Sequence, residues 1–72
     1  SMDKPRKRFE PRKRTALDGQ KWWCVWDNKK NEWSTLIWFG RYRSRSGCLY
    51  GISRVRQEIW NEKEGKWTKS EN

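Results

Sequence analysis

The sequence of 72 residues contains no histidine and only two cysteines. Histidine is the commonest general base and the commonest zinc ligand, so its absence argues against both kinds of site. Cys24 and Cys48 are too few for a disulfide-dense scaffold and lack a C-x-x-C spacing, so we expect buried free thiols, with a disulfide as the alternative. No glycine-rich phosphate-binding motif is present either. We predict a protein that is not an enzyme and that needs no metal or cofactor.

Long hydrophobic runs are also missing. No apolar stretch approaches the roughly 18–20 residues of a membrane span, and no secretory signal region is visible. We therefore expect an intracellular protein without a membrane partner, in the cytoplasm or nucleoid, or in the nucleus of a eukaryote. A chain of this length forms one small domain that buries about 60% of its unfolded surface. Seven tryptophans, two tyrosines and two phenylalanines predict a thin, mostly aromatic core.

The net charge of +9 is concentrated in two segments. Residues 1–20 hold seven basic and three acidic residues, and residues 41–56 hold five arginines and no acid, whereas the rest of the chain is neutral. The first segment contains both prolines and repeats Pro-Arg-Lys-Arg. Low hydrophobicity and high charge predict a flexible basic arm over 1–19, followed by a single small β domain over 20–70. A solubilising tail and a nuclear-import signal are alternative readings of the arm.

An imperfect repeat built around tryptophan pairs predicts two β-hairpins. Val25–Ser34 recurs 34 positions later as Ile59–Thr68, and each copy reads β-branched residue, Trp, polar loop, Trp, hydroxyl residue. Strand-forming residues on both sides of a turn rich in Asn, Asp, Gly and Lys are typical of a hairpin. We expect the two tryptophans of each copy to face each other across its turn, Trp26 with Trp33 and Trp60 with Trp67.

The segment between the two copies predicts a longer hairpin. We expect strands over 21–27 and 32–45, and Ser46-Gly47 is a plausible two-residue turn. This turn would align the four tryptophans of the repeat in one row across four strands, and it would set Tyr42 over Gly51. The predicted fold class is all-β, a small four-stranded antiparallel meander with a disordered basic N-terminal arm.

Residues 53–64 also fit a helix. Ile52, Val55, Ile59 and Trp60 lie at helical spacing, so the alternative fold is a three-stranded sheet plus a C-terminal helix over 53–64. Two glutamates near the C-terminal end of that helix count against it, because negative charge is unfavourable there.

The far half of the long hairpin interleaves arginines with aromatic residues. Guanidinium groups bind phosphates bidentately, and aromatic rings stack on bases. We predict a nucleic-acid-binding module that contacts DNA or RNA through this ribbon and through the arm. The predicted contact residues are Arg41, Arg43, Arg45, Arg54, Arg56, Phe39 and Tyr50 of the ribbon, and Arg6, Lys7, Arg8, Arg12, Lys13 and Arg14 of the arm.

Three alternatives to nucleic-acid binding remain open. A small protein-interaction or inhibitory factor, of the phage or mobile-element type, would bind an acidic protein partner through the arginines and exposed tryptophans. An apolar sheet face would support a homodimer. A basic ribbon that only resists edge aggregation is the third. Which sheet face forms the core stays open: either the tryptophan row, or the face with Trp23, Leu36, Trp38, Tyr42 and Val55.

Overall fold

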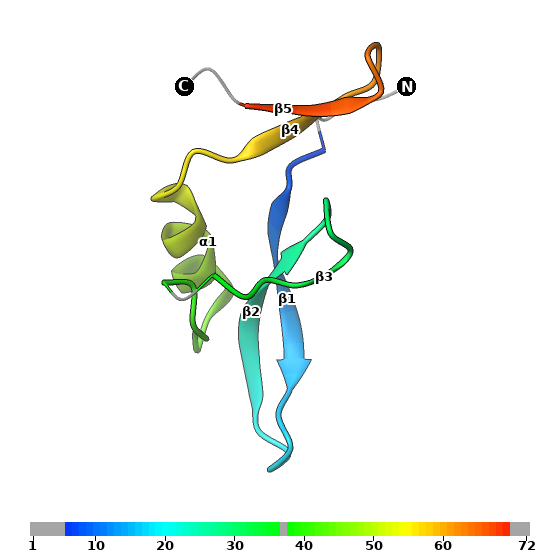
Figure 1. Ribbon diagram of the computed structural model, residues 1–72. Helices are drawn as coiled ribbons and strands as arrows, with labels where there is room; N and C mark the ends of the chain where they lie inside the picture. The colour runs from blue at the N-terminus through cyan, green and yellow to red at the C-terminus, as the bar shows by residue number, and fades with distance from the viewer. Residues whose placement is uncertain (1–5, 37, 70–72) are drawn as a thin grey trace.

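The structure is a computed structural model, which describes residues 6–36 and 38–69. Within these ranges the elements are β1 (Phe9–Thr15), β2 (Lys21–Asp27), β3 (Glu32–Trp33), α1 (Arg45–Ser53), β4 (Glu58–Asn61) and β5 (Lys66–Lys69). The strands form two antiparallel sheets, one in the order β1-β2-β3 and one made of β4 and β5 (Figure 1). The chain is therefore mostly β with one short helix, and the predicted four-stranded meander is wrong.

β1 occupies part of the segment for which we expected a flexible arm. It pairs with β2 along its whole length, from Phe9 opposite Asp27 to Thr15 opposite Lys21. Phe9 is buried in the core, and Pro11 is tolerated because β1 lies at the edge of its sheet. The flexible arm is therefore wrong for β1, whereas residues 1–5 of the predicted arm lie outside the described residues. The predicted domain boundary at residue 20 falls in the turn between β1 and β2.

The residues just before β1 connect the two sheets. Lys7 forms a β-bridge with Ile59, and the backbone N–H of Trp60 donates to the carbonyl of Arg6 at 2.8 Å. The segment 6–15 thus passes from the hairpin of β4 and β5 to β2 as one extended stretch, drawn in blue in Figure 1. The N-terminal segment is the connection between the two copies of the repeat.

The second predicted strand pairs with β2 only near its two ends. Trp33 lies opposite Trp26, and Tyr42 forms a bridge with Trp23. A continuous ladder would place Leu36 opposite Trp23, so six residues leave the sheet before Tyr42 returns to it. Side chains of a strand alternate between the two faces of the sheet, and the number of residues that leave the sheet is even. The Tyr42 side chain therefore lies on the face that the Leu36 side chain would have occupied in a continuous ladder.

α1 forms where we expected a hairpin turn at Ser46-Gly47. Ser44 is its N-cap, and its hydroxyl accepts a hydrogen bond from the Gly47 backbone N–H at 3.1 Å. Cys48 and Ile52 are four residues apart, so both side chains lie on the helix face that packs against the sheet, and both are buried. The capping hydroxyl and this apolar pair favour a helix over the predicted strand turn.

The alternative prediction of a helix over 53–64 is also wrong. α1 ends at Ser53, the residue that would have begun the alternative helix, and Arg54 is its C-cap. Residues 58–61 form β4 and pair with β5. α1 begins eight residues before the alternative helix was expected to begin, and the second hairpin of the all-β prediction is kept.

The core lies between α1 and one face of the β1–β2–β3 sheet. Its buried hydrophobic residues are Phe9, Val25, Phe39, Cys48 and Ile52, and the half-buried residues packed against them are Trp23, Leu36, Tyr42 and Val55. The Phe9 and Phe39 rings meet edge-on, with centroids 5.1 Å apart. The core therefore uses the second of the two candidate faces, except for Trp38, which is exposed. Both cysteines are free thiols, and burial raises the pKa of Cys48.

Both tryptophan pairs of the repeat are confirmed. Trp26 faces Trp33 across the first hairpin (β2 and β3), and Trp60 faces Trp67 across the second hairpin (β4 and β5). Each pair is T-shaped, with ring centroids 5.1 and 5.4 Å apart. The two pairs belong to different sheets, so the predicted single row of four tryptophans is wrong.

Candidate nucleic-acid interface

The face of the β1–β2–β3 sheet that points away from α1 carries tryptophans and arginines. Since Phe9 and Val25 point into the core, their neighbours in β1 and β2 point to the opposite side. Trp33 pairs with Trp26 and shares its side, and the residues on both sides of Tyr42 project there too. We call this surface the Trp–Arg face, and it consists of Glu10, Arg12, Arg14, Trp22, Cys24, Trp26, Trp33, Arg41 and Arg43.

Guanidinium groups lie over the three tryptophan rings of this face. Cation–π contacts of this kind are favourable for arginine, whose planar group lies over the ring while its N–H edges stay available to other acceptors. The distances from the guanidinium carbon to the ring centroid are 4.5 Å for Arg12 over Trp26, 4.7 Å for Arg14 over Trp33, and 4.3 and 5.2 Å for Arg41 and Arg43 over Trp22. The tryptophans therefore hold four cations in place on one surface.

This positive charge is balanced only in part. Glu10 accepts from Arg12 Nε at 2.7 Å. Burial of this carboxylate opposes ionisation, but hydrogen bonds from Arg12 and Asn28 outweigh it and hold the pKa of Glu10 below its usual value. In the part of the chain that the structure describes, no carboxylate lies within salt-bridge distance of Arg14, Arg41 or Arg43. The face thus has four guanidinium groups and one carboxylate.

An unsatisfied donor lies at the same place. Trp22 Nε1 is buried and has no hydrogen-bond partner among the described residues. Trp22 lines a small cavity of about 160 Å³ together with Arg14, Ala16, Cys24 and Arg41. Because a buried donor without a partner costs free energy, a site that combines it with two guanidinium groups favours an anionic acceptor.

The structure brings together four of the predicted contact residues that the sequence analysis placed in separate regions. Arg12 and Arg14 were assigned to the arm, and Arg41 and Arg43 to the ribbon. They share one face because β1 flanks β2 on one side and the segment around Tyr42 flanks it on the other. The period-two spacing of Arg12 and Arg14 is the signal in the sequence that could have indicated a strand with both arginines on one side.

Arg8 has a structural role that the sequence analysis did not predict. Its Nε and Nη2 donate to the two carboxylate oxygens of Asp27 at 3.0 and 2.9 Å, and its Nη1 donates to Glu58 at 2.8 Å. The Asp27 side chain is only 4% exposed, and Lys29 makes a second ion pair with Glu58 at 3.1 Å. Arg8 therefore joins the two sheets at the point where the chain passes between them, and its guanidinium is engaged by protein carboxylates.

Electrostatic contacts at this junction shift the ionisation of its members. Burial of Asp27 opposes its ionisation, but hydrogen bonds from Arg8 and from the Lys30 backbone N–H outweigh burial and lower the pKa of Asp27. The pKa of Glu58 is also lowered, because hydrogen bonds from Lys29 and Arg8 outweigh desolvation. Hydrogen bonding to Asp27 raises the pKa of Arg8, so all three groups are charged at neutral pH.

The remaining predicted contact residues lie elsewhere. Phe39 is 2% exposed and belongs to the core, so its prediction as a base-stacking residue is wrong. Arg45, Tyr50 and Arg54 lie on α1 or at its C-cap, on the other side of the sheet, and Arg56 is exposed in the segment between α1 and β4. Three more predicted contact residues belong to the N-terminal segment. The ammonium group of Lys13 lies over Trp23 on the helix side of the sheet, and Lys7 is exposed. The guanidinium group of Arg6 lies over Trp67 of the second hairpin.

The three tryptophans of the Trp–Arg face were not among the predicted nucleic-acid contacts, and exposed tryptophans were expected to bind a partner only in the alternative of an acidic protein. In the predicted hairpin, the contact arginines lie in the far half, away from the row of tryptophans. The structure superimposes the two, because the arginines of β1 and of the segment 41–43 lie over the tryptophans of β2 and β3.

No protein-family model, no curated protein and no solved structure matches this chain. Its function is therefore argued from the geometry of the chain itself. Over residues 6–36 and 38–69, no helix has both the length and the hydropathy needed to cross a membrane. In the same ranges, no three His, Cys, Asp or Glu side chains are grouped so that they could hold a metal ion.

Proposed function

We propose that the protein binds nucleic acid through the Trp–Arg face, with backbone phosphates as its main contact. The observation that carries this proposal is the set of three arginines, Arg14, Arg41 and Arg43, that lie over tryptophan rings without a carboxylate partner among the described residues. Arginines that only solubilise a surface need no such support, since a solvated side chain gains entropy from remaining mobile.

The electrostatics of the face favour a polyanion. Guanidinium groups held on one surface repel each other, and a chain of phosphates relieves this repulsion at several positions together. Because the stacked guanidinium groups are already positioned, they lose less freedom on binding than extended side chains would. Trp22, whose buried Nε1 has no hydrogen-bond partner among the described residues, lines a small cavity together with Arg14 and Arg41.

The same geometry favours recognition of the backbone over recognition of bases on this face. The rings of Trp22, Trp26 and Trp33 are covered by guanidinium groups, so they offer little open surface for base stacking. Phosphate contacts position a protein on nucleic acid without reading its sequence. We therefore expect DNA and RNA of different sequences to bind with similar affinity through this face.

Salt dependence and charge reversal test the proposal. Fluorescence anisotropy would be measured with labelled duplex and single-stranded oligonucleotides at several salt concentrations. If the four arginines each neutralise one phosphate, log K falls against log salt with a slope of roughly −3 to −4 on duplex DNA. The double variant Arg41→Glu/Arg43→Glu is expected to lose on the order of 100-fold in affinity at low salt, because it removes two contacts and adds two repulsive charges.

A matched control separates the face from overall charge. The variant Lys63→Glu/Lys69→Glu changes the net charge by the same amount on the second hairpin, where both side chains are exposed. We expect it to lose only a few-fold. Equal losses in the two variants would contradict the assignment to the Trp–Arg face, and absence of binding at low salt would contradict nucleic-acid binding. Polyglutamate that competes as well as nucleic acid would instead favour an acidic protein partner.

A further inference from the structure

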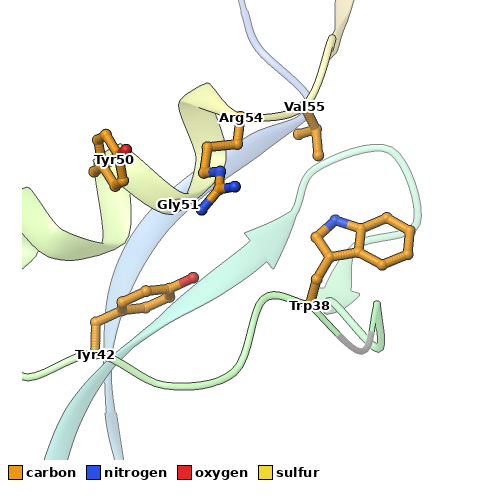
Figure 2. Close-up of a pocket in the computed structure, with 6 residues that line it drawn as sticks. All are labelled: Trp38, Tyr42, Tyr50, Gly51, Arg54 and Val55. Atoms are coloured by element: carbon orange, nitrogen blue, oxygen red, sulfur yellow. The ribbon is translucent and has the colours of Figure 1, made fainter.

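A groove of about 450 Å³ lies on the opposite side of the sheet from the Trp–Arg face. Its lining residues are Trp38, Tyr42, Tyr50, Gly51, Arg54 and Val55. Figure 2 shows Arg54 extending from the end of α1 into the space between Tyr42 and Trp38, with Tyr50 on the helix beside it. The groove thus lies between α1 and the six-residue excursion that precedes Tyr42.

The excursion exposes Trp38. Its neighbour Phe39 is buried in the core, and the Phe39 backbone N–H donates to the carbonyl of Leu36 at 3.1 Å, which closes a tight turn. Gly40 follows with φ of +53°, a conformation that favours glycine. Trp38 is 61% exposed and is the only one of the seven tryptophans, all of them within the described residues, whose side chain is not at least half-buried.

Tyr42 forms the opposite side of the groove. Its backbone N–H and carbonyl bond to Trp23 at 2.8 and 2.7 Å, which fixes the ring against the helix. The Tyr42 hydroxyl approaches Gly51 so closely that a Cβ at that position would collide with it. The contact between Tyr42 and Gly51 that we expected from a strand ladder therefore exists, but it joins the sheet edge to α1. The absence of a side chain at Gly51 leaves room for the Tyr42 hydroxyl.

The chemistry of the groove matches a planar, electron-rich ligand. It presents three aromatic rings and one cation, and no carboxylate is among its lining residues. Tyr50 is 68% exposed and has the Arg54 guanidinium 6.0 Å from its ring centroid. Arg54 disfavours a quaternary ammonium ligand, which aromatic sites without a nearby cation often bind. Rings together with arginine are the combination that binds unpaired bases in single-stranded nucleic acid.

We infer that this groove binds one unpaired nucleobase, stacked on Trp38, with Arg54 contacting its edge or its phosphate. The inference rests on the proposed function, because it takes the strand held by the Trp–Arg face as the source of the base. Arg41 and Arg43 belong to that face and flank Tyr42, which lines the groove, so one backbone segment presents both sites at the same sheet edge. A base must leave a duplex to enter the groove, so the site favours single-stranded or bulged nucleic acid over paired duplex.

Replacement of Trp38 tests the inference. Binding of the full chain would be measured to a single-stranded oligonucleotide, to a duplex, and to an abasic oligonucleotide of the same length, each at one salt concentration. Trp38→Ala is expected to weaken single-strand binding by roughly tenfold, the size of one lost base stack, and to leave duplex and abasic binding within about twofold. Leu49→Ala is the matched control, since Leu49 is an exposed apolar residue of α1 outside the groove.

The outcomes separate the inference from the proposed function. Unchanged single-strand binding in Trp38→Ala, or the same loss with the abasic oligonucleotide, would overturn the nucleobase site while the phosphate-binding face stands. No binding of any oligonucleotide to the unaltered protein would overturn both. As a measurement that does not depend on affinity, the indole N–H signal of Trp38 in a nitrogen–proton correlation spectrum is expected to shift with the single strand and not with the abasic one.

Discussion

The two hairpins of the repeat have similar sequences and equivalent tryptophan pairs, yet they differ in almost everything around those pairs. Trp26 and Trp33 lie in a three-stranded sheet with a helix on its other face, whereas Trp60 and Trp67 lie in a two-stranded sheet. Among the described residues, the first pair has Arg12 and Arg14 over its rings, and the second has only Arg6. A cross-strand aromatic pair thus defines a hairpin locally, while the neighbouring strands decide whether its surface becomes a candidate site.

The positions after the first tryptophan of each copy show the same contrast. Asp27 accepts from Arg8 and from the backbone N–H groups of Lys29 and Lys30, so it both closes its turn and joins the sheets. Within the described residues, the side chain of the equivalent Asn61 accepts only from the Glu64 backbone N–H, at 3.0 Å. One polar side chain therefore serves the whole fold, and the other serves its own turn.

The largest expected difference comes from truncating these two residues. Asp27→Ala leaves the Arg8 guanidinium half-paired and two turn N–H groups without their acceptor, so we expect a loss of about 2–4 kcal/mol in the free energy of unfolding. Asn61→Ala removes one turn hydrogen bond and should lose about 1 kcal/mol or less. Urea denaturation followed by circular dichroism measures both. Equal losses would show that the second hairpin is as firmly integrated as the first.

Acid should destabilise the junction through the same residue. The pKa values of Asp27 and Glu58 are lower in the folded chain than their ordinary values of 3.8 and 4.5, so the unfolded chain takes up protons first as the pH falls. Their contribution to stability is complete above about pH 5 and is lost progressively below it. Asp27→Asn should give a shallower decrease of unfolding free energy between pH 5 and 2. A slope identical to that of the unaltered protein would contradict the pairing of Asp27 with Arg8.

Truncation of one tryptophan in each hairpin separates stability from binding. Trp33→Ala and Trp67→Ala each remove one ring of a T-shaped pair, so we expect each to lose roughly 1–2 kcal/mol of unfolding free energy. Of these two tryptophans, only Trp33 supports an arginine of the Trp–Arg face, so Trp33→Ala should also weaken duplex binding several-fold. Binding that falls equally in both variants would mean that the second hairpin shares in the interface.

The smallest expected effect is at the exposed ion pair of the junction. Lys29 pairs with Glu58 at 3.1 Å, but its own side chain is 41% exposed, so water screens the interaction. Lys29→Ala should lower the free energy of unfolding by about 0.5 kcal/mol or less. Lys63→Ala, in the turn of the second hairpin, should cause no measurable loss. Thermal denaturation at low and high salt is the measurement, since the small difference should disappear at high salt.

Local features of the sequence were sufficient for the elements whose partners lie close by in the chain. β2 has the predicted bounds, because its three tryptophans and Val25 favour a strand. The two turns were identified from their polar residues, and both tryptophan pairs followed from them. Arg41 and Arg43 were identified as candidate contact residues, and they lie on the Trp–Arg face.

Elements that depend on distant partners were not predicted. β1 contains Pro, Glu, Arg and Lys, which are depleted in strands, and it is a strand because β2 provides its hydrogen-bond partners. α1 contains two glycines and two serines, which are weak helix formers, and burial of Cys48 and Ile52 against the sheet favours it. Phe39 lies in the core and not on a surface because the excursion folds back over the sheet.

By itself, the sequence determined that this chain has two tryptophan hairpins and an excess of arginine in two segments, because each of these is a property of composition or of contacts across a short turn. Only the tertiary structure decided that the N-terminal segment is a strand connecting both hairpins, and that its arginines share one face with Arg41 and Arg43. The physical reason is that a strand has no internal hydrogen bonds: its existence, and the neighbours of its side chains, depend on which distant strand it pairs with.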